Sequence, residues 1–532
     1  LRKIFKITMF KNQPKGLLAA ALANMGERFG FYIMMAILVL FLQAKYGFDG
    51  TKAGWIYSVF YFSIYILSFV GGVIADKTKN FKGTILAGLL LMTAGYAVIA
   101  IPTPTPSPNP ALFVTITCAG LFVIAFGNGL FKGNLQALVG QMYDNEKYAQ
   151  MRDSGFSLFY MFINVGAIFA PIMAVGVRNW WVQHSGFAYN ADMPAFCHTQ
   201  LAGNLEGESL VRFQEFAAQF GYSDLTLFAN DYLGVFTTGF HYAFACAIGA
   251  MLISLAIYLS NQRKFPGMER KAADTKRPDK AQVMMEAREV RQRLYALLAV
   301  FGVVIFFWFS FHQNGLTLTM FAKEYTNLSG INIDLGFTQI RGAEIFQSIN
   351  PLCVVVLTPV VMGVFGWLRA RGKEPSTPKK IAIGMGIAAL GFVVMAVGSY
   401  VAELPLWSSL FEKVTDPATG EQSVKVLREF PNELRVTPFL LIGTYVILTV
   451  AELCISPLGI SFVSKVAPPQ YQGIMQGGWL GATAIGNQLL VIGAILYESI
   501  PIWMTWGVFV VACTISMVVM LSMVKWLERV TE

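Results

Sequence analysis

The sequence predicts an all-α integral membrane protein with twelve transmembrane helices. Of its 532 residues, 55% are hydrophobic and 13% are charged. Soluble globular domains carry about 25% charged residues. Apolar runs of about 20 residues, the length that crosses a bilayer, recur along the whole chain. These observations exclude a soluble protein and favour a polytopic helix bundle.

The twelve spans follow from the apolar runs and from the turn chemistry between them. Residues 101–110, for example, hold five prolines in ten positions and cannot form a helix. The expected spans are residues 17–43, 53–75, 84–101, 111–140, 155–177, 236–260, 295–321, 343–368, 380–402, 437–465, 474–497 and 502–527.

The charges predict the topology. The net charge is +9, and 28 of the 40 Lys and Arg residues fall in loops on the side of the N-terminus. Cytoplasmic loops are enriched in Lys and Arg, so we expect both termini in the cytoplasm. The basic excess then faces anionic lipid headgroups, and we expect no nucleic-acid partner.

The chain divides into two halves. We expect an N-terminal six-helix bundle over 1–260, a cytoplasmic linker over 261–294 and a C-terminal six-helix bundle over 295–532. Each half carries one long outward-facing loop, near 178–235 and near 403–436. Repeated halves are typical of secondary transporters, whose substrate site lies near the middle of the bilayer.

The cytoplasmic loops of the two halves share a short pattern. GGVIADKTKNFKG (71–83) ends the second span, and a weaker version, GVFGWLRARGK (363–373), ends the eighth. The first string resembles the cytoplasmic loop motif of the major facilitator superfamily. The resemblance implies that fold, with two six-helix bundles.

Few charged or strongly polar residues lie within the spans. Burying an ionised residue in a membrane costs roughly 2.5–3.5 kcal/mol on insertion scales, so such residues usually mark a transport pathway. A structural ion pair is the alternative. These residues are Glu27, Arg28, Lys132, Asn164, His312, Gln313, Asn350 and Glu452.

Glu27 and Arg28 are adjacent, and adjacent side chains leave a helix about 100° apart. We therefore expect Glu27 to pair with Lys132, the other buried cation of the first half. Such a clamp is either permanent or opens when Glu27 is protonated or when substrate arrives.

The buried charges are distributed unevenly between the halves. Arg28 and Lys132 are cations of the first half, whereas Glu452 has no cation in the second half. A buried carboxylate without a partner either takes up a proton or meets a cationic ligand. A zwitterionic solute with separated charges would present its anionic group to Arg28 and Lys132 and its cationic group to Glu452.

Several strings resemble motifs of the proton-coupled oligopeptide transporter family, over nearly the whole length. The resemblance implies proton symport of di- and tripeptides by alternating access, and a bacterial inner membrane. The strings are ERFGFY, GNGLFKGNLQALVGQMY, FSLFYMFINVGAIFAP, FFWFSFHQNG, FQSINPL and LTVAELCISPLGISFVSKVAP.

The resemblance also implies roles for individual residues. Arg28 and Lys132 correspond to the pair that receives the peptide carboxylate. Glu452, with Asn164 and Asn350, corresponds to the set that receives the peptide amino group. The remaining expected substrate residues are Tyr32, Tyr65, Trp308, Gln313 and Trp479.

The chain departs from the family pattern at positions that bear on coupling. Asn24 and His312 stand where the family has acids, Met35 stands where it has an arginine, and Gly133 replaces a proline. We expect Glu27, Lys132 and His312 to serve proton coupling. His312 either titrates, since a histidine pKa lies near 6.5, or acts as a neutral hydrogen-bonding strut.

Other readings stay open at this point. The same fold could carry another zwitterionic or anionic solute, act as an uncoupled facilitator, or bind peptide without moving it. An intramembrane enzyme is not expected, since the sequence has no HExxH and no GxSxG string. No cofactor, metal site or disulfide framework is expected either. The expected partners are peptides, protons and membrane lipids, with the chain a monomer.

Overall fold

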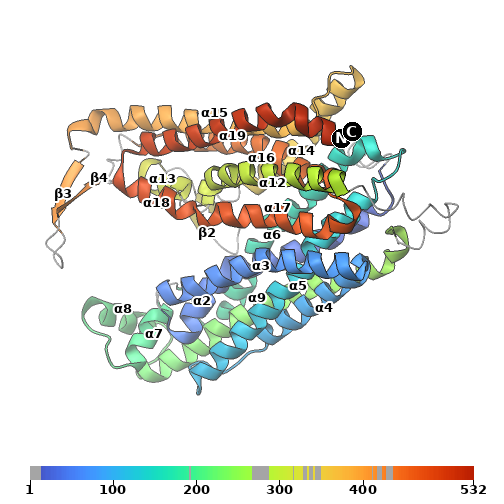
Figure 1. Cartoon of the computed structure of the whole chain (residues 1–532). Coiled ribbons are helices and arrows are strands. Elements are labelled where there is room, and N and C mark those ends of the chain that lie inside the picture. The colour runs from blue at the N-terminus through green and yellow to red at the C-terminus, as the bar shows by residue number, and fades with distance from the viewer. Residues whose placement is uncertain are drawn as a thin grey trace. The chain divides into compact units, whose positions relative to one another are not determined.

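A computed structural model gives the fold of the chain, and it is almost entirely helical (Figure 1). Four short strands form two antiparallel hairpins, β1 (Asn332–Asp334) with β2 (Gln339–Arg341) and β3 (Phe411–Thr415) with β4 (Gln422–Val426). The predicted all-helical membrane fold is confirmed. The described residues are 13–48, 50–190, 193–266, 287–315, 317–327, 332–334, 339–341, 349–409, 411–415, 422–426 and 435–531.

Within these residues, eleven helices are long and apolar enough to cross a membrane. Each coincides with one of the predicted spans, because hydrophobic length rather than fine periodicity marks a membrane helix. They are α2 (Leu17–Tyr46), α3 (Gly50–Thr78), α4 (Phe81–Ala100), α5 (Pro110–Gln141), α6 (Arg152–His184), α9 (Leu225–Ser260), α12 (Ala287–Phe311), α14 (Ile349–Ala370), α15 (Thr377–Glu403), α16 (Pro438–Val466) and α19 (Ile502–Thr531).

Two predicted spans are interrupted. The expected span 474–497 is two consecutive helices, α17 (Gln472–Gln488) and α18 (Leu490–Ser499). The expected span 295–321 is α12, then the 3-10 turn η3 (His312–Gly315), then α13 (Thr317–Tyr325). Both interruptions lie beside polar side chains of the candidate site described below.

The remaining helices are short. The expected outward loop 178–235 is largely helical, because α6 runs on to His184 and α9 begins at Leu225. His198 ties this segment to α2, with its Nε2 2.8 Å from the Ala44 carbonyl oxygen. The short helices are α7 (Met193–Leu201), α8 (Gly207–Ala218), η1 (Ala149–Met151), η2 (Gln262–Lys264), η5 (Leu404–Ser409) and η7 (Pro469–Tyr471).

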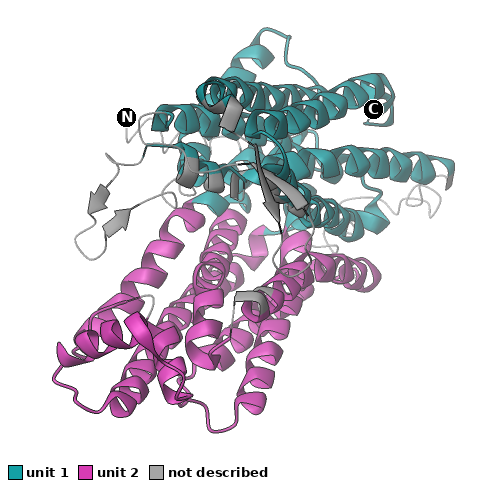
Figure 2. Cartoon of the chain, turned by 90° about the vertical axis from the view of Figure 1, so that its left-hand side faces the viewer, with its two compact units in different colours: residues 1–18, 136–164, 265–532 teal, residues 19–135, 165–264 magenta. Residues whose placement is uncertain are grey.

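The chain forms two compact units (Figure 2). Unit 1 contains residues 1–18, 136–164 and 265–532, and unit 2 contains residues 19–135 and 165–264. Helix α5 therefore begins in unit 2 and ends in unit 1, and α6 begins in unit 1 and ends in unit 2. The bundles 1–260 and 295–532 stay a prediction. Most of the predicted linker lies outside the described residues.

Glycines set the packing of α5 in unit 2. A Cβ atom at Gly129 would lie 2.5 Å from the Leu67 carbonyl oxygen of α3. A Cβ atom at Gly127 would lie 2.7 Å from the Gly88 carbonyl oxygen of α4. Small residues let membrane helices approach to backbone contact. The backbone of α5 around Lys132 is therefore fixed against two neighbouring helices.

Candidate functional site

Glu27 and Arg28 form a buried ion pair on α2. The Arg28 Nε lies 2.6 Å from Glu27 Oε2, and the Arg28 Nη2 lies 2.7 Å from Glu27 Oε1. Their exposed fractions are 1% and 3%. The expectation that these neighbours do not meet is wrong. The 100° offset describes the Cα–Cβ directions, and two long side chains can bend back across it.

Lys132 therefore does not pair with Glu27, and the prediction of a Glu27–Lys132 ion pair is wrong. Lys132 lies on α5 with its Nζ 4.6 Å from the centre of the Tyr65 ring, a cation–π contact. It makes no ion pair with any carboxylate in the described parts of the chain. The Glu27–Arg28 pair acts on it electrostatically. Of these two predicted cations, Arg28 is therefore paired with an acid and Lys132 is not.

Asn128 completes the polar contacts of Glu27. This α5 residue is 1% exposed, and its Nδ2 donates to Glu27 Oε1 over 2.5 Å. It was not among the residues predicted from the sequence. Its only signal was its place in the string GNGLFKGN, four residues before Lys132.

Aromatic rings surround the cations of unit 2. The Arg28 guanidinium carbon lies 4.4 Å from the centre of the Phe31 ring, and Phe31 packs edge-on against Tyr32. The hydroxyl of Tyr65 lies 3.3 Å from the hydroxyl of Tyr61. The structure thus brings four predicted residues of unit 2 together, namely Glu27, Arg28, Lys132 and Tyr65.

Glu452 occupies a buried position on α16 in unit 1. It is 5% exposed and accepts hydrogen bonds from Tyr160 (2.5 Å) and Asn350 (2.8 Å). Neither donor carries a charge. The predicted Asn164 donates instead to the backbone oxygen of Tyr160, over 3.2 Å. No ion pair involves Glu452 within the described residues, so unit 1 holds a carboxylate with neutral partners.

Sequence reasoning missed Tyr160. The residue lies four positions before Asn164 in FSLFYMFINVG, on the same face of α6. Aromatic residues are common in membrane helices, so only the spacing from Asn164 could have indicated it.

The end of α12 places His312 and Gln313. The His312 ring stacks on Trp308 with centroids 4.7 Å apart, and its Nδ1 lies against Asn487 Oδ1 of α17. Gln313 is fully buried and donates to the backbone oxygens of Phe309 (3.3 Å) and Leu490 (3.4 Å). The second of these contacts reaches the start of α18.

Two predicted tryptophans are buried in unit 1. Trp479 is 2% exposed and packs against Phe301, with ring centroids 6.3 Å apart. It also faces Gly459, where a Cβ atom would lie 2.0 Å from the indole ring. Trp308 is 5% exposed. Its indole nitrogen has no hydrogen-bond partner among the residues that the structure describes.

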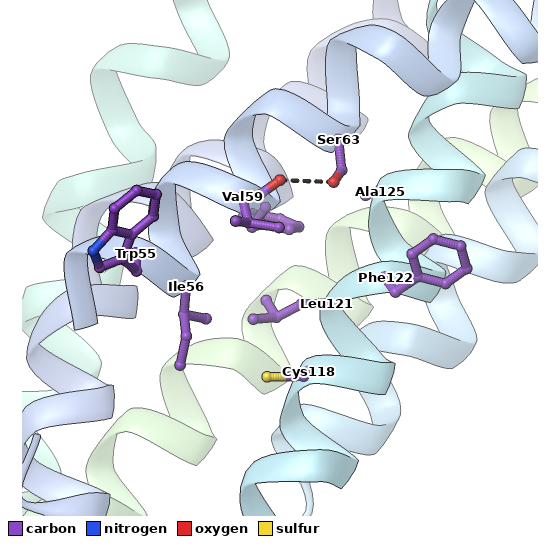
Figure 3. A pocket seen from close by; sticks show the side chains of 9 residues that line it. Trp55, Ile56, Val59, Ser63, Cys118, Leu121, Phe122 and Ala125 are labelled. Carbon is purple, nitrogen blue, oxygen red and sulfur yellow. Dashed lines mark hydrogen bonds between the residues drawn. The ribbon is translucent and has the colours of Figure 1, made fainter. Parts of the chain in front are cut away.

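A cavity of about 250 Å³ lies between α3 and α5 in unit 2. Figure 3 shows α3 and α5 contributing apolar side chains, and the Ser63 hydroxyl bonded to the Val59 carbonyl oxygen. No charged residue lines it, so it offers nothing to bind an ionised group. Its lining residues are Trp55, Ile56, Val59, Phe60, Ser63, Cys118, Leu121, Phe122 and Ala125.

The family model described as POT family matches residues 82–272 and 269–505, which together are most of the chain. This chain belongs to the POT family. The resemblance that the motifs indicated is therefore confirmed. The chain is a multi-pass membrane protein of a family of transporters.

Individual bacterial transporters are similar over nearly the whole chain. The peptide transporter YePEPT of Yersinia enterocolitica is 27% identical over 502 residues, covering 90% of this chain and 87% of that protein. The dipeptide and tripeptide permease B of Xenorhabdus bovienii is 24% identical, covering 98% and 96%.

Solved structures show the same fold. A POT family transporter in complex with a thioalcohol conjugated peptide has a TM-score of 0.57 and 21% identity, covering 99% of this chain and 100% of that one. A peptide transporter POT in complex with sulfate has a TM-score of 0.56 and 22% identity, covering 97% and 96%.

Proposed function

We propose that this POT-family chain is a secondary active transporter that imports di- and tripeptides by proton symport with alternating access. One observation carries the proposal. Each unit holds a charged side chain on a membrane-spanning helix that forms no ion pair with a described residue, the partly buried Lys132 in unit 2 and the buried Glu452 in unit 1. Buried charges are normally paired, so each is suited to one end of a zwitterion.

The two charged groups divide the recognition of a peptide between them. Arg28 and Lys132 receive the peptide carboxylate, for which the planar guanidinium of arginine is suited. Glu452 receives the amino group. Asn350 orients this carboxylate through its 2.8 Å hydrogen bond, and Asn164 supports Tyr160. The residues proposed to contact the rest of the peptide are Tyr32, Tyr65, Trp308, Gln313 and Trp479.

Proton coupling starts at Glu27. Both oxygens of its carboxylate accept hydrogen bonds from Arg28. Protonation removes the charge that holds the pair, so Arg28 is released toward the peptide carboxylate. Deprotonation re-forms the pair and expels the carboxylate. Lys132 contributes positive charge beside the pair, and His312 is a second candidate proton site in unit 1.

The setting of the protein follows from its family and its charges. We propose that it is a monomer in a bacterial inner membrane, with both termini in the cytoplasm and membrane lipids around it. Its cargo crosses the membrane without chemical change, so it acts as a transporter and not as an enzyme.

Blocking the termini of a dipeptide tests the recognition. N-acetylation removes the charge that Glu452 would meet, and amidation of the C-terminus removes the charge that Arg28 and Lys132 would meet. Breaking such a buried pair typically costs about 3–5 kcal/mol. Binding should therefore weaken by a factor of about 100 or more for either change, measured by competition on purified protein.

Two results would contradict this recognition. Equal affinity for free and blocked dipeptides rules out both charged sites. If another zwitterionic solute displaces the probe and dipeptides do not, the fold carries a different cargo.

A further inference from the structure

Asn128 touches the Glu27–Arg28 pair from a neighbouring helix. Its Nδ2 donates to Glu27 Oε1 over 2.5 Å, in addition to the two hydrogen bonds from Arg28. Hydrogen bonds to an ionised group are roughly twice as strong as neutral ones. The Asn128 amide therefore stabilises the ionised form of Glu27 without adding a charge.

The other end of the same amide is unpaired. Asn128 Oδ1 is buried and has no hydrogen-bond partner among the described residues. A buried acceptor without a partner is destabilising. An amide carries a donor and an acceptor, and a half-turn about its last torsion exchanges them. After that turn Oδ1 faces Glu27 and can accept a hydrogen bond from the protonated carboxyl.

The backbone of Asn128 cannot shift to replace this contact. Gly127 and Gly129 lie on either side of it and pack against the backbones of α4 and α3, where a Cβ atom would lie 2.7 and 2.5 Å from a carbonyl oxygen. The side chain therefore extends toward Glu27 from a backbone position that is fixed by helix packing. Its free motion is rotation of the amide.

Other groups also act on the pair. Lys132 can only donate a hydrogen bond, whereas a tyrosine hydroxyl can donate and accept. The Asn128 amide can also do both, and it is hydrogen-bonded directly to Glu27. Two further helices pack on α2 at this level, α9 through the Ser254 hydroxyl and α6 through Gly166, and neither residue ionises. The ionisable groups are Lys132 on α5, Tyr96 on α4, Tyr65 on α3 and Tyr32 on α2.

We propose that Asn128 is a positioning residue for proton coupling. Its amide serves both protonation states of Glu27 and thereby sets the pH at which the Glu27–Arg28 pair opens. This inference rests on the proposed function, in which Glu27 carries the coupled proton.

The test is the pH dependence of proton-driven dipeptide uptake in proteoliposomes. Asn128→Ala removes hydrogen bonds to both forms of Glu27, and because the bond to the ionised carboxylate is the stronger one, Glu27 accepts a proton more readily. We expect the midpoint of uptake to move to higher pH by about one unit. Dipeptide counterflow, which needs no net proton movement, shows that the variant still binds and exchanges substrate.

Asn134→Ala is the matched control. Asn134 is also a buried amide on α5, and it donates to the Gly71 carbonyl oxygen over 3.0 Å instead of to Glu27. Its replacement should leave the midpoint at the wild-type pH. An equal shift in both variants would mean that any lost buried amide moves the profile, and would overturn the inference.

Glu27→Gln separates the two proposals. If this variant still accumulates dipeptide, Glu27 is not the proton site, so the role of Asn128 falls together with the proposed role of Glu27, whereas proton symport through another group stands. If it loses accumulation while Asn128→Ala keeps the wild-type midpoint, the proposed function stands and the role of Asn128 is overturned. Should Asn128→Ala not fold, Asn128→Ser carries the test. A smaller upward shift is then expected, and an unchanged midpoint again overturns the role.

Discussion

The residues that matter most are buried charges whose partners do not cancel them. Tyr160 and Asn350 each donate a hydrogen bond to Glu452, which offsets part of the cost of burying a carboxylate. Neither donor brings a positive charge. Hydrogen bonds keep the carboxylate in place, and its attraction for a cation remains.

Glu452→Gln should act selectively on peptides with a free amino group. The amide keeps the shape of the side chain and loses its charge, so we expect affinity for a free dipeptide to fall by about 3 kcal/mol or more. Affinity for the N-acetylated dipeptide should change little. Competition binding with both peptides measures the difference.

Tyr160→Phe is the control for this prediction. It removes one hydrogen bond to the charged group, which is worth about 1.5–3 kcal/mol, and keeps the charge. Tyr160→Phe should therefore weaken binding of the free dipeptide less than Glu452→Gln does. If Glu452→Gln lowers the affinity for free and acetylated dipeptides equally, Glu452 does not bind the amino group.

At the residue scale, the sequence was informative about which side chains carry charge and less so about their neighbours. Glu27, Lys132 and Glu452 stand out because charged residues are costly in a membrane span. The partner of Glu27 could not be predicted, because it depends on how two long side chains bend. Asn128 was missed although the amides Asn164 and Asn350 were predicted, because its contact with Glu27 joins α5 to α2 and depends on packing. Tyr160 was missed because aromatic residues are common in membrane helices.

At the scale of elements, hydrophobic length predicted eleven described helices and not the breaks within them. The break between α17 and α18 is at Leu489, which follows the polar residues Asn487 and Gln488. Gln313 of η3 donates to the Leu490 backbone oxygen beside that break, over 3.4 Å. Such a contact joins residues 177 positions apart, so no local pattern could indicate it.

The connection between α14 and α15 is held by an ion-pair cluster within unit 1. Glu374 accepts hydrogen bonds from Arg369 (2.5 Å) and Lys380 (2.7 Å), and Lys380 also donates to Asp153 of α6 over 2.8 Å. Burial tends to raise the pKa of Glu374, but the hydrogen bonds from Arg369 and Lys380 outweigh it and hold the pKa below its ordinary value of 4.5.

This cluster predicts a pH-dependent contribution to stability. Because the pKa of Glu374 is lower in the folded protein, its ionised form contributes stability above pH 4.5, which is lost as the pH falls through the folded value. Glu374→Gln should therefore lower the free energy of unfolding by about 1–3 kcal/mol at neutral pH. The difference from wild type should shrink in acid. Thermal unfolding in detergent at neutral and acidic pH measures it.

Glu528→Gln is the matched control for Glu374→Gln. Glu528 pairs with Lys379 at a more exposed position, with side chains 29% and 50% exposed. Exposed pairs contribute about 0–1 kcal/mol. Two results would contradict the account of the cluster. One is that Glu374→Gln lowers the free energy of unfolding by no more than Glu528→Gln does. The other is that its effect is the same at neutral and acidic pH.

At the scale of the whole molecule, the two helices α5 and α6 each take part in both units. Helix α5 carries Asn128 and Lys132 in unit 2 and ends in unit 1, and α6 carries Tyr160 in unit 1 and ends in unit 2. Motifs spread along the sequence predicted the family, whereas the assignment of α5 and α6 to both units depends on packing that motifs do not encode.

The loss of family acids at Asn24 and His312 makes proton coupling the central claim to test. Uptake of a labelled dipeptide into proteoliposomes containing the wild-type protein, with the outside made acidic, measures it most directly. Coupling through Glu27 predicts that dipeptide accumulates inside above its outside concentration, and that a protonophore abolishes the accumulation. Equilibration without accumulation, at every imposed proton gradient, would contradict coupling and show an uncoupled facilitator.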